Sequence, residues 1–122
     1  MWKDLAPEIC RQRLVIEGKP NAPITDTDIK AYLSKLSEVL KMKTVLEPIT
    51  HNSSKFGWAG WIHWETSGTH FYAWDVPFLF FSVDIYTCKK FDDDVAVAFT
   101  KEFFKVNEVV FRGFSNCVIE NS

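Results

Sequence analysis

The clearest hydrophobic pattern in this chain is the alternation within residues 78–88. The odd positions Leu79, Phe81, Val83 and Ile85 are apolar, whereas the even positions from 82 on are polar or reactive, namely Ser82, Asp84, Tyr86 and Cys88. A period of two is typical of a strand that buries one face and leaves the other open. The pattern therefore predicts a strand whose open face carries its reactive groups.

Two further strands are predicted just before this one, at 58–65 and 69–74. The step Ser67-Gly68 lies between them and suits a tight turn, so a hairpin is expected there. Side chains of a strand alternate between its faces, so at least one tryptophan of the first strand must belong to the core. The three candidates are Trp58, Trp61 and Trp64.

Two segments carry apolar residues at helical spacing. The first begins after Thr25, which can form a capping pair with Asp28, and continues as the stripe Ile29, Tyr32, Leu33, Leu36, Val39 and Leu40. The second follows three aspartates at 92–94, which favour a helix N-terminus, and its expected buried stripe is Val95, Phe99 and Phe103. Each helix is therefore expected to pack on one side only.

Short strands are predicted at 13–17, at 44–46 before Pro48, and at 109–111, with a polar loop at 51–54 and a loose tail after Phe114. The order is strand-helix-strand-strand, then strand-strand-helix-strand. This order predicts an α+β fold, a two-layer sandwich of a mostly antiparallel sheet with two helices on one face. The other face needs a cover, and a second copy of the chain is the simplest one, so a homodimer is expected.

Composition narrows the class of protein. A chain of 122 residues with 47% hydrophobic and 16% aromatic residues is expected to form one packed domain over 1–122. Its net charge of −2 offers no electrostatic reason to bind nucleic acid or a membrane surface. The longest apolar run, 76–83, is too short to span a bilayer, and the charged start does not resemble a signal peptide. A cytoplasmic protein is expected.

The three cysteines are Cys10, Cys88 and Cys117. An odd number, wide spacing and no CxxC pair indicate a reduced compartment, with neither a disulfide framework nor a zinc knuckle. A zinc site can be drawn from His63, Glu65, His70 and Cys88. Because that spacing matches no strong ligand pattern, no metal is expected.

With this order of elements, two motifs resemble the prokaryotic S-adenosylmethionine decarboxylase family. The run Gly57-Trp58-Ala59-Gly60, continuing to Glu65-Thr66-Ser67-Gly68, is similar to the family's G-V-[ST]-G-x4-A-E-S-H. The segment VDIYTC at 83–88 matches the family's V-D-[IVL]-[FY]-T-C, and Trp74 matches the aromatic residue of I-H-T-[WY]. The resemblance spans about 14–114.

The resemblance implies a pyruvoyl cofactor made by self-cleavage at a serine, and decarboxylated S-adenosylmethionine as the product, for spermidine synthesis. Ser67 aligns with the serine that becomes pyruvoyl, and Cys88 aligns with the cysteine that returns a proton to the substrate. The chain departs from the pattern at Thr66, Gly68 and Tyr72, where the family has glutamate, histidine and the processing histidine. It also departs at Ala59, which replaces a serine or threonine.

The remaining roles follow from chemistry near these motifs. His70 is the histidine close enough in sequence to act as the base for Ser67, and Glu65, Thr66 and Tyr72 are candidates for assisting the cleavage. The sulfonium and adenine of S-adenosylmethionine favour aromatic faces, which Phe56, Trp58 or Trp61 offer. Asp84 shares a face with Cys88 and could either orient the substrate's amine or hold a neighbouring backbone amide.

Each assignment has a plainer alternative. Ser67 is equally well explained as a turn residue, Cys88 as a small apolar residue and His70 as a half-buried strand residue. Three functions stay open: an S-adenosylmethionine decarboxylase, a pyruvoyl decarboxylase of arginine or ornithine, and an uncleaved homologue. That homologue would have no cofactor and would bind a ligand or regulate a partner.

Overall fold

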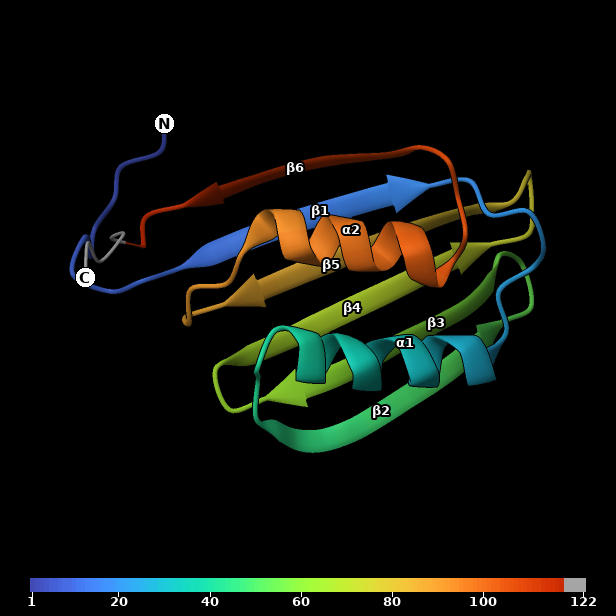
Figure 1. The fold of residues 1–122 in the computed structure, drawn as a ribbon, viewed down its shortest axis with the longest axis horizontal. Coiled ribbons are helices and arrows are strands. Elements are labelled where there is room, and N and C mark those ends of the chain that lie inside the picture. Colours follow the sequence, from blue (N-terminus) through green and yellow to red (C-terminus); the bar gives the residue numbers. More distant parts are fainter. Residues whose placement is uncertain (118–122) are drawn as a thin grey trace.

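The protein, seen here as a computed structural model that describes residues 1–117, forms two layers (Figure 1). One layer is a six-stranded antiparallel sheet and the other is a pair of helices on one face of it. In chain order the elements are β1 (Gln12–Gly18), α1 (Asp26–Val39), β2 (Thr44–Ser53), β3 (Gly57–Trp64), β4 (Ser67–Trp74), β5 (Phe80–Thr87), α2 (Asp93–Phe103) and β6 (Val109–Ser115). The predicted α+β class, order and layering are confirmed.

The strands lie in the order β2-β3-β4-β5-β1-β6. Three of them, β3, β4 and β5, follow one another as antiparallel neighbours, whereas β1 is inserted between β5 and β6. The start and the end of the described chain therefore lie at the same end of the sheet (Figure 1). None of the helices within residues 1–117 is long and apolar enough to cross a membrane.

The core lies between the helices and the sheet. The odd positions of β5 are buried as predicted, since Phe81, Val83 and Ile85 are fully inaccessible to solvent. Trp64 on β3 is also fully buried, and its indole N–H donates to Ser37 Oγ of α1 at 2.7 Å. Pairing the indole in this way removes the cost of burying an unsatisfied donor and ties α1 to the sheet.

The predicted cap of α1 is confirmed. The Thr25 side chain accepts from the Asp28 backbone N–H, and the Asp28 carboxylate accepts in return from the Thr25 N–H. The acids before α2 also lie where expected, because Asp92 caps that helix and accepts from the Asp94 N–H at 2.9 Å.

The predicted stripe of α2 is wrong in part. Ala96 and Thr100 are fully buried, Phe99 and Phe103 are partly buried, and Val95 is exposed. A polar residue can be buried here because the Thr100 hydroxyl donates to the Ala96 carbonyl at 2.8 Å and lies 2.6 Å from the Tyr32 hydroxyl. Periodicity counts only apolar residues, so it could not place Thr100 inside.

Two predicted boundaries are also wrong. The strand predicted to stop before Pro48 is β2, which continues through the predicted polar loop to Ser53. A proline is tolerated because β2 is an edge strand whose register shifts between Leu46 and Ile49. The hairpin turn is formed by Glu65 and Thr66, so Ser67 already belongs to β4.

The prediction of unpaired cysteines is wrong as well. Cys10 and Cys117, 107 positions apart, form a disulfide, and Cys88 is free. They meet because Gln12 of β1 pairs with Ser115 of β6, so the residues before β1 and after β6 lie together. The Asn116 backbone N–H donates to the Arg11 carbonyl at 3.2 Å, and the Arg11 backbone N–H donates to the Asn116 side-chain Oδ1 at 2.7 Å. Spacing along the chain contains no information about such a pairing.

Candidate active site

Ser67 is the first residue of β4 and pairs with Trp64 on one side and Thr87 on the other. A two-residue turn requires the chain to reverse abruptly, and Ser67 absorbs the reversal with a φ of +139°. Residues with a side chain rarely adopt this region, and holding one there costs on the order of 1–3 kcal/mol. Backbone strain of this kind often marks functional positions.

Gly68 follows Ser67 where the related family pattern has histidine. A Cβ at this position would lie 2.3 Å from the Ile62 carbonyl oxygen, which is closer than a Cβ can approach a backbone atom. The glycine is therefore a steric requirement of the backbone here, and no side chain at 68 is available for catalysis.

The carbonyl oxygen of Thr66 belongs to the peptide bond that precedes Ser67, and donors from the end of β5 surround it. The Cys88 backbone N–H donates to it at 3.0 Å, and the Cys88 thiol lies 3.3 Å away. The Thr87 hydroxyl is 3.2 Å from this oxygen and 3.0 Å from Thr66 Oγ1, so its single proton is shared between them. Such donors stabilise negative charge on a carbonyl oxygen.

Four of the predicted site residues come together from three strands. Ser67, His70, Asp84 and Trp61 line one hollow of about 210 Å³ on the open face of the sheet. The other lining residues are His63, Gly68 and Tyr86. The hollow forms because register places Trp61, His70 and Asp84 side by side on β3, β4 and β5.

His70 lies among aromatic side chains within this hollow. Its Nδ1 is 3.3 Å from the Tyr72 hydroxyl, and its ring stacks on Tyr72 at a centroid distance of 6.0 Å. The Trp61 ring is also near the imidazole, with a centroid distance of 6.0 Å. Tyr72, which aligns with the family's processing histidine, therefore contacts the candidate base His70.

Arg13 is a site residue that sequence reasoning missed. Its Nε and Nη2 donate to the two carboxylate oxygens of Asp84 at 2.9 and 2.8 Å. These hydrogen bonds, together with the negative charge, raise the pKa of Arg13 above its ordinary value. The one signal in the sequence was that Arg13 faces outward in the strand predicted at 13–17. This signal does not identify its partner on β5, Asp84, which lies 71 positions away.

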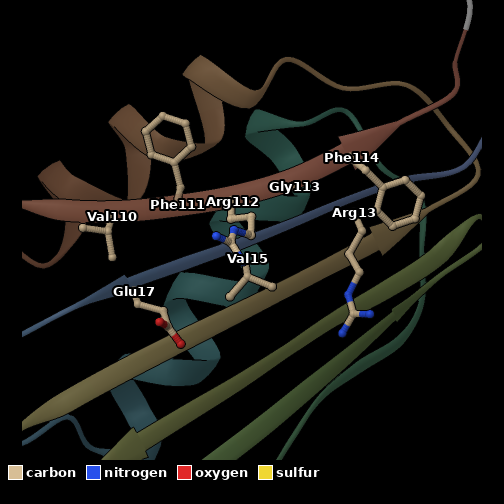
Figure 2. Close-up of a pocket in the computed structure, with 8 residues that line it drawn as sticks. All are labelled: Arg13, Val15, Glu17, Val110, Phe111, Arg112, Gly113 and Phe114. Atoms are coloured by element: carbon tan, nitrogen blue, oxygen red, sulfur yellow. The ribbon is translucent and has the colours of Figure 1, made fainter. Parts of the chain in front are cut away.

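A larger groove of about 750 Å³ runs beside this ion pair, between β1 and β6 (Figure 2). Arg13 lines it and extends from β1 over the sheet toward Asp84, which lines the hollow at Ser67. The remaining lining residues are Val15, Glu17, Val110, Phe111, Arg112, Gly113 and Phe114. The open face is thus continuous from β3 to β6 and mixes apolar with charged side chains.

Three predicted residues lie away from this site. Phe56 is in the turn before β3, at the opposite end of that strand from Ser67, because Ser67 pairs with Trp64 at the far end. Trp58 packs against the core on the helix-covered face. Glu65 is exposed in the turn and faces Lys43 at 3.4 Å, a surface ion pair of little energetic weight. The structure does not bring these three into the hollow.

Within residues 1–117, no three side chains among histidine, cysteine, aspartate and glutamate gather closely enough to hold a metal ion. His63 and His70 share the hollow at Ser67, but Cys88 points at the Thr66 carbonyl and Glu65 lies in the exposed turn.

The fold and site together define a two-layer α+β protein with a strained serine at a hairpin beside a hydrogen-bonded carbonyl. The sequence model of the family described as S-adenosylmethionine decarboxylase matches residues 16–116, and the chain belongs to this family. This result confirms the resemblance drawn from the motifs around Ser67 and Cys88. Family and fold together support an S-adenosylmethionine decarboxylase-like function.

Solved structures agree on the fold. The crystal structure of the adenosylmethionine decarboxylase from Aquifex aeolicus VF5 is similar with a TM-score of 0.71 and 12% sequence identity, over 93% of this chain and 96% of that chain. At 12% sequence identity this similarity is evidence for a shared fold alone. Among curated proteins, none matches this chain.

Proposed function

We propose that this chain is a self-cleaving S-adenosylmethionine decarboxylase of spermidine biosynthesis, with Ser67 as the source of its pyruvoyl group. The observation that carries the proposal is the environment of the bond between Thr66 and Ser67. The carbonyl that a serine hydroxyl would attack already accepts the Cys88 N–H, and the serine next to it has a strained backbone. Both features lie at the one peptide bond that the proposed cleavage would break.

The cleavage can be written with named atoms. Ser67 Oγ attacks the Thr66 carbonyl carbon, the C–N bond breaks, and the chain continues through an ester. Charge on the Thr66 oxygen is stabilised by the Cys88 N–H and by Thr87. A base then removes the Ser67 Cα proton, and elimination releases the Thr66 carboxylate. Hydrolysis of the remaining dehydroalanine releases ammonia and leaves a pyruvoyl group at 67, with His70 as the base in the same hollow.

When present, the pyruvoyl group supplies an electron sink for decarboxylation. The chain's own residues would position the substrate and move its proton. Trp61 and His70 offer flat faces to adenine and to the sulfonium, and the Asp84–Arg13 pair presents both charges to the substrate's amine and carboxylate. Cys88, whose thiol is at the Thr66 carbonyl, is the proposed proton donor to the substrate carbon.

A second candidate is an uncleaved homologue that binds a ligand or regulates a catalytic partner. Thr66, Gly68 and Tyr72 favour it, because they stand where the family pattern has a glutamate, a histidine and the processing histidine. His70 could take the place of the missing histidines, since it shares the hollow with Ser67 and contacts Tyr72. The third candidate, an arginine or ornithine decarboxylase, would use the same cleavage with another substrate.

The proposal includes a homodimer in the cytoplasm. The open face of the sheet exposes Tyr72 and Tyr86 near the hollow at Ser67, and Val110 and Phe114 along the groove between β1 and β6. A second copy laid on this face would bury these side chains and exclude water from the hollow. In a reducing cytoplasm the Cys10–Cys117 pair would also be exposed to thiol reductants.

The test of the proposal is the intact mass of freshly purified protein under denaturing and reducing conditions, because the Cys10–Cys117 disulfide would otherwise hold the two fragments together. We expect two fragments that divide between Thr66 and Ser67, the second lacking a free amino group. A single species of 14.1 kDa that persists for days would overturn self-cleavage and favour the uncleaved homologue. Cleaved protein that releases carbon dioxide from arginine or ornithine, but not from S-adenosylmethionine, would support the third candidate.

Thr87→Val is expected to slow the cleavage. Valine keeps the shape of threonine but removes the hydroxyl beside the Thr66 carbonyl, and loss of one such donor typically costs about 10²–10³ in rate. Thr69→Val is the matched control, because Thr69 is buried on neighbouring β4 and its hydroxyl has no hydrogen-bond partner within the described residues. A time course of intact mass measures both variants. Equal rates for the two variants would remove Thr87 from the mechanism.

A further inference from the structure

All three cysteines of the chain line one hollow at the end of the sheet. This hollow has a volume of about 510 Å³, and its walls include Cys10, Cys117 and Cys88 together with Lys90. It is separate from the hollow at Ser67 and from the groove between β1 and β6. The disulfide of Cys10 and Cys117 and the free, exposed thiol of Cys88 therefore share one solvent-filled space.

The register of three strands brings these sulfur atoms together. Gln12 of β1 pairs with Thr87 of β5 on one side and with Ser115 of β6 on the other. The residues just outside these pairs are Cys88 after β5 and Cys117 after Asn116, and both lie beside the segment that carries Cys10. The arrangement follows from the sheet order and keeps the three cysteines near one another in every folded molecule.

We propose that this hollow is a thiol–disulfide exchange site in which Cys88 attacks the disulfide between Cys10 and Cys117. The Cys88 thiolate forms a new S–S bond with one of the two sulfurs, the old S–S bond breaks, and the other sulfur leaves as a thiolate. That thiolate takes up the proton that Cys88 released. The exchange is redox-neutral, because one disulfide and one thiolate are replaced by another disulfide and another thiolate, so it needs no external oxidant or reductant.

The surroundings of Cys88 suit this reaction. Its side chain is exposed, and within the described residues the hydrogen bond it makes is to the Thr66 carbonyl at 3.3 Å, which a rotation about Cα–Cβ breaks. Lys90 and Glu8 line the same hollow. Lys89 is directed elsewhere, since its ammonium group donates to the Lys41 carbonyl.

The consequence rests on the proposed function. Exchange removes the Cys88 thiol from the Thr66 carbonyl and holds the proposed proton donor in a covalent bond. The exchanged protein would be inactive, and a thiol reductant that opens the new bond would restore it. The site then regulates the decarboxylase according to the redox state around it.

Peptide mapping tests the exchange directly, because trypsin places the three cysteines on separate peptides: 4–11, 56–89 and 113–122. The full chain is held without reductant or oxygen at pH 8 and quenched over time with acid and N-ethylmaleimide. We expect the link between 4–11 and 113–122 to decline while a link from 56–89 to either peptide appears. Tenfold dilution should leave the rate unchanged, since the reaction is intramolecular.

Cys88→Ser is the matched control, and it should retain the link between 4–11 and 113–122 at every time point. The proposal is overturned if the folded wild-type chain keeps this link and a fully alkylated Cys88 for days, while the same chain exchanges in guanidinium. Self-cleavage is read separately, because it splits 56–89 into 56–66 and 67–89. Exchange on an intact 56–89 would support the thiol site and count against the proposed function, and cleavage without exchange would do the reverse.

Discussion

Ser67→Ala is expected to yield a single uncleaved chain of 14.1 kDa with no measurable decarboxylation. Alanine removes the hydroxyl that attacks the Thr66 carbonyl and supplies no atom from which a pyruvoyl group can form. Removing the nucleophile of a preorganised site typically lowers rates by roughly 10⁴-fold or more. Intact mass reports the cleavage, and carbon dioxide release from S-adenosylmethionine reports the activity.

The control for this variant is Ser82→Ala, which removes a serine hydroxyl from the open face of β5, where Ser82 pairs with Tyr72 and Glu17. It should cleave like the wild type. Ser67→Gly adds a test of backbone strain, because glycine adopts positive φ without a steric penalty. Relative to Ser67→Ala it should raise the free energy of unfolding by about 1 kcal/mol, as measured in urea. Cleavage or activity in Ser67→Ala would disprove the assignment of Ser67.

Cys88→Ala is expected to separate cleavage from turnover. The variant keeps the Cys88 backbone N–H and Thr87 at the Thr66 carbonyl, so cleavage should slow only modestly. It loses the thiol that returns the proton to the substrate, and loss of a positioned general acid typically costs about 10²–10⁴ in turnover. Intact mass gives the cleaved fraction, and turnover is then expressed per cleaved chain.

Cys117→Ser in the presence of a reductant is the matched control for Cys88→Ala. It removes a thiol from the same end of the sheet but from no position near the Thr66 carbonyl, so both cleavage and turnover should match the wild type. Equal turnover of Cys88→Ala and Cys117→Ser per cleaved chain would show that Cys88 is not the proton donor.

Local patterns predicted much of the fold. The alternation at 78–88 predicted which side of β5 is buried, since neighbouring side chains of a strand must point in opposite directions. Thr25 and Asp28 predicted the start of α1, because a capping box involves residues within one turn of each other. The errors came where a local rule has a tertiary exception, as with Pro48 on the edge strand β2 and Thr100 buried in α2.

The candidate site, like the fold, was predicted only in part from the sequence. Ser67, His70, Trp61 and Asp84 were predicted from motif and chemistry, and the structure gathers them into one hollow. Phe56 and Trp58 were chosen for their aromatic rings alone, and they lie at the other end of β3 and on the helix-covered face. Aromatic character does not specify a face or an end of a strand.

The sequence by itself therefore determined the family, the order of elements and the buried face of each well-patterned strand. These depend on residue identity and on spacings of two to four positions. Only the tertiary structure decided that Arg13 pairs with Asp84, that Cys88 reaches the Thr66 carbonyl, and that Cys10 meets Cys117. Each of these contacts depends on strand order and register. Strand order and register arise when the whole sheet packs against its helices, so they cannot be read from the spacing of residues along the chain.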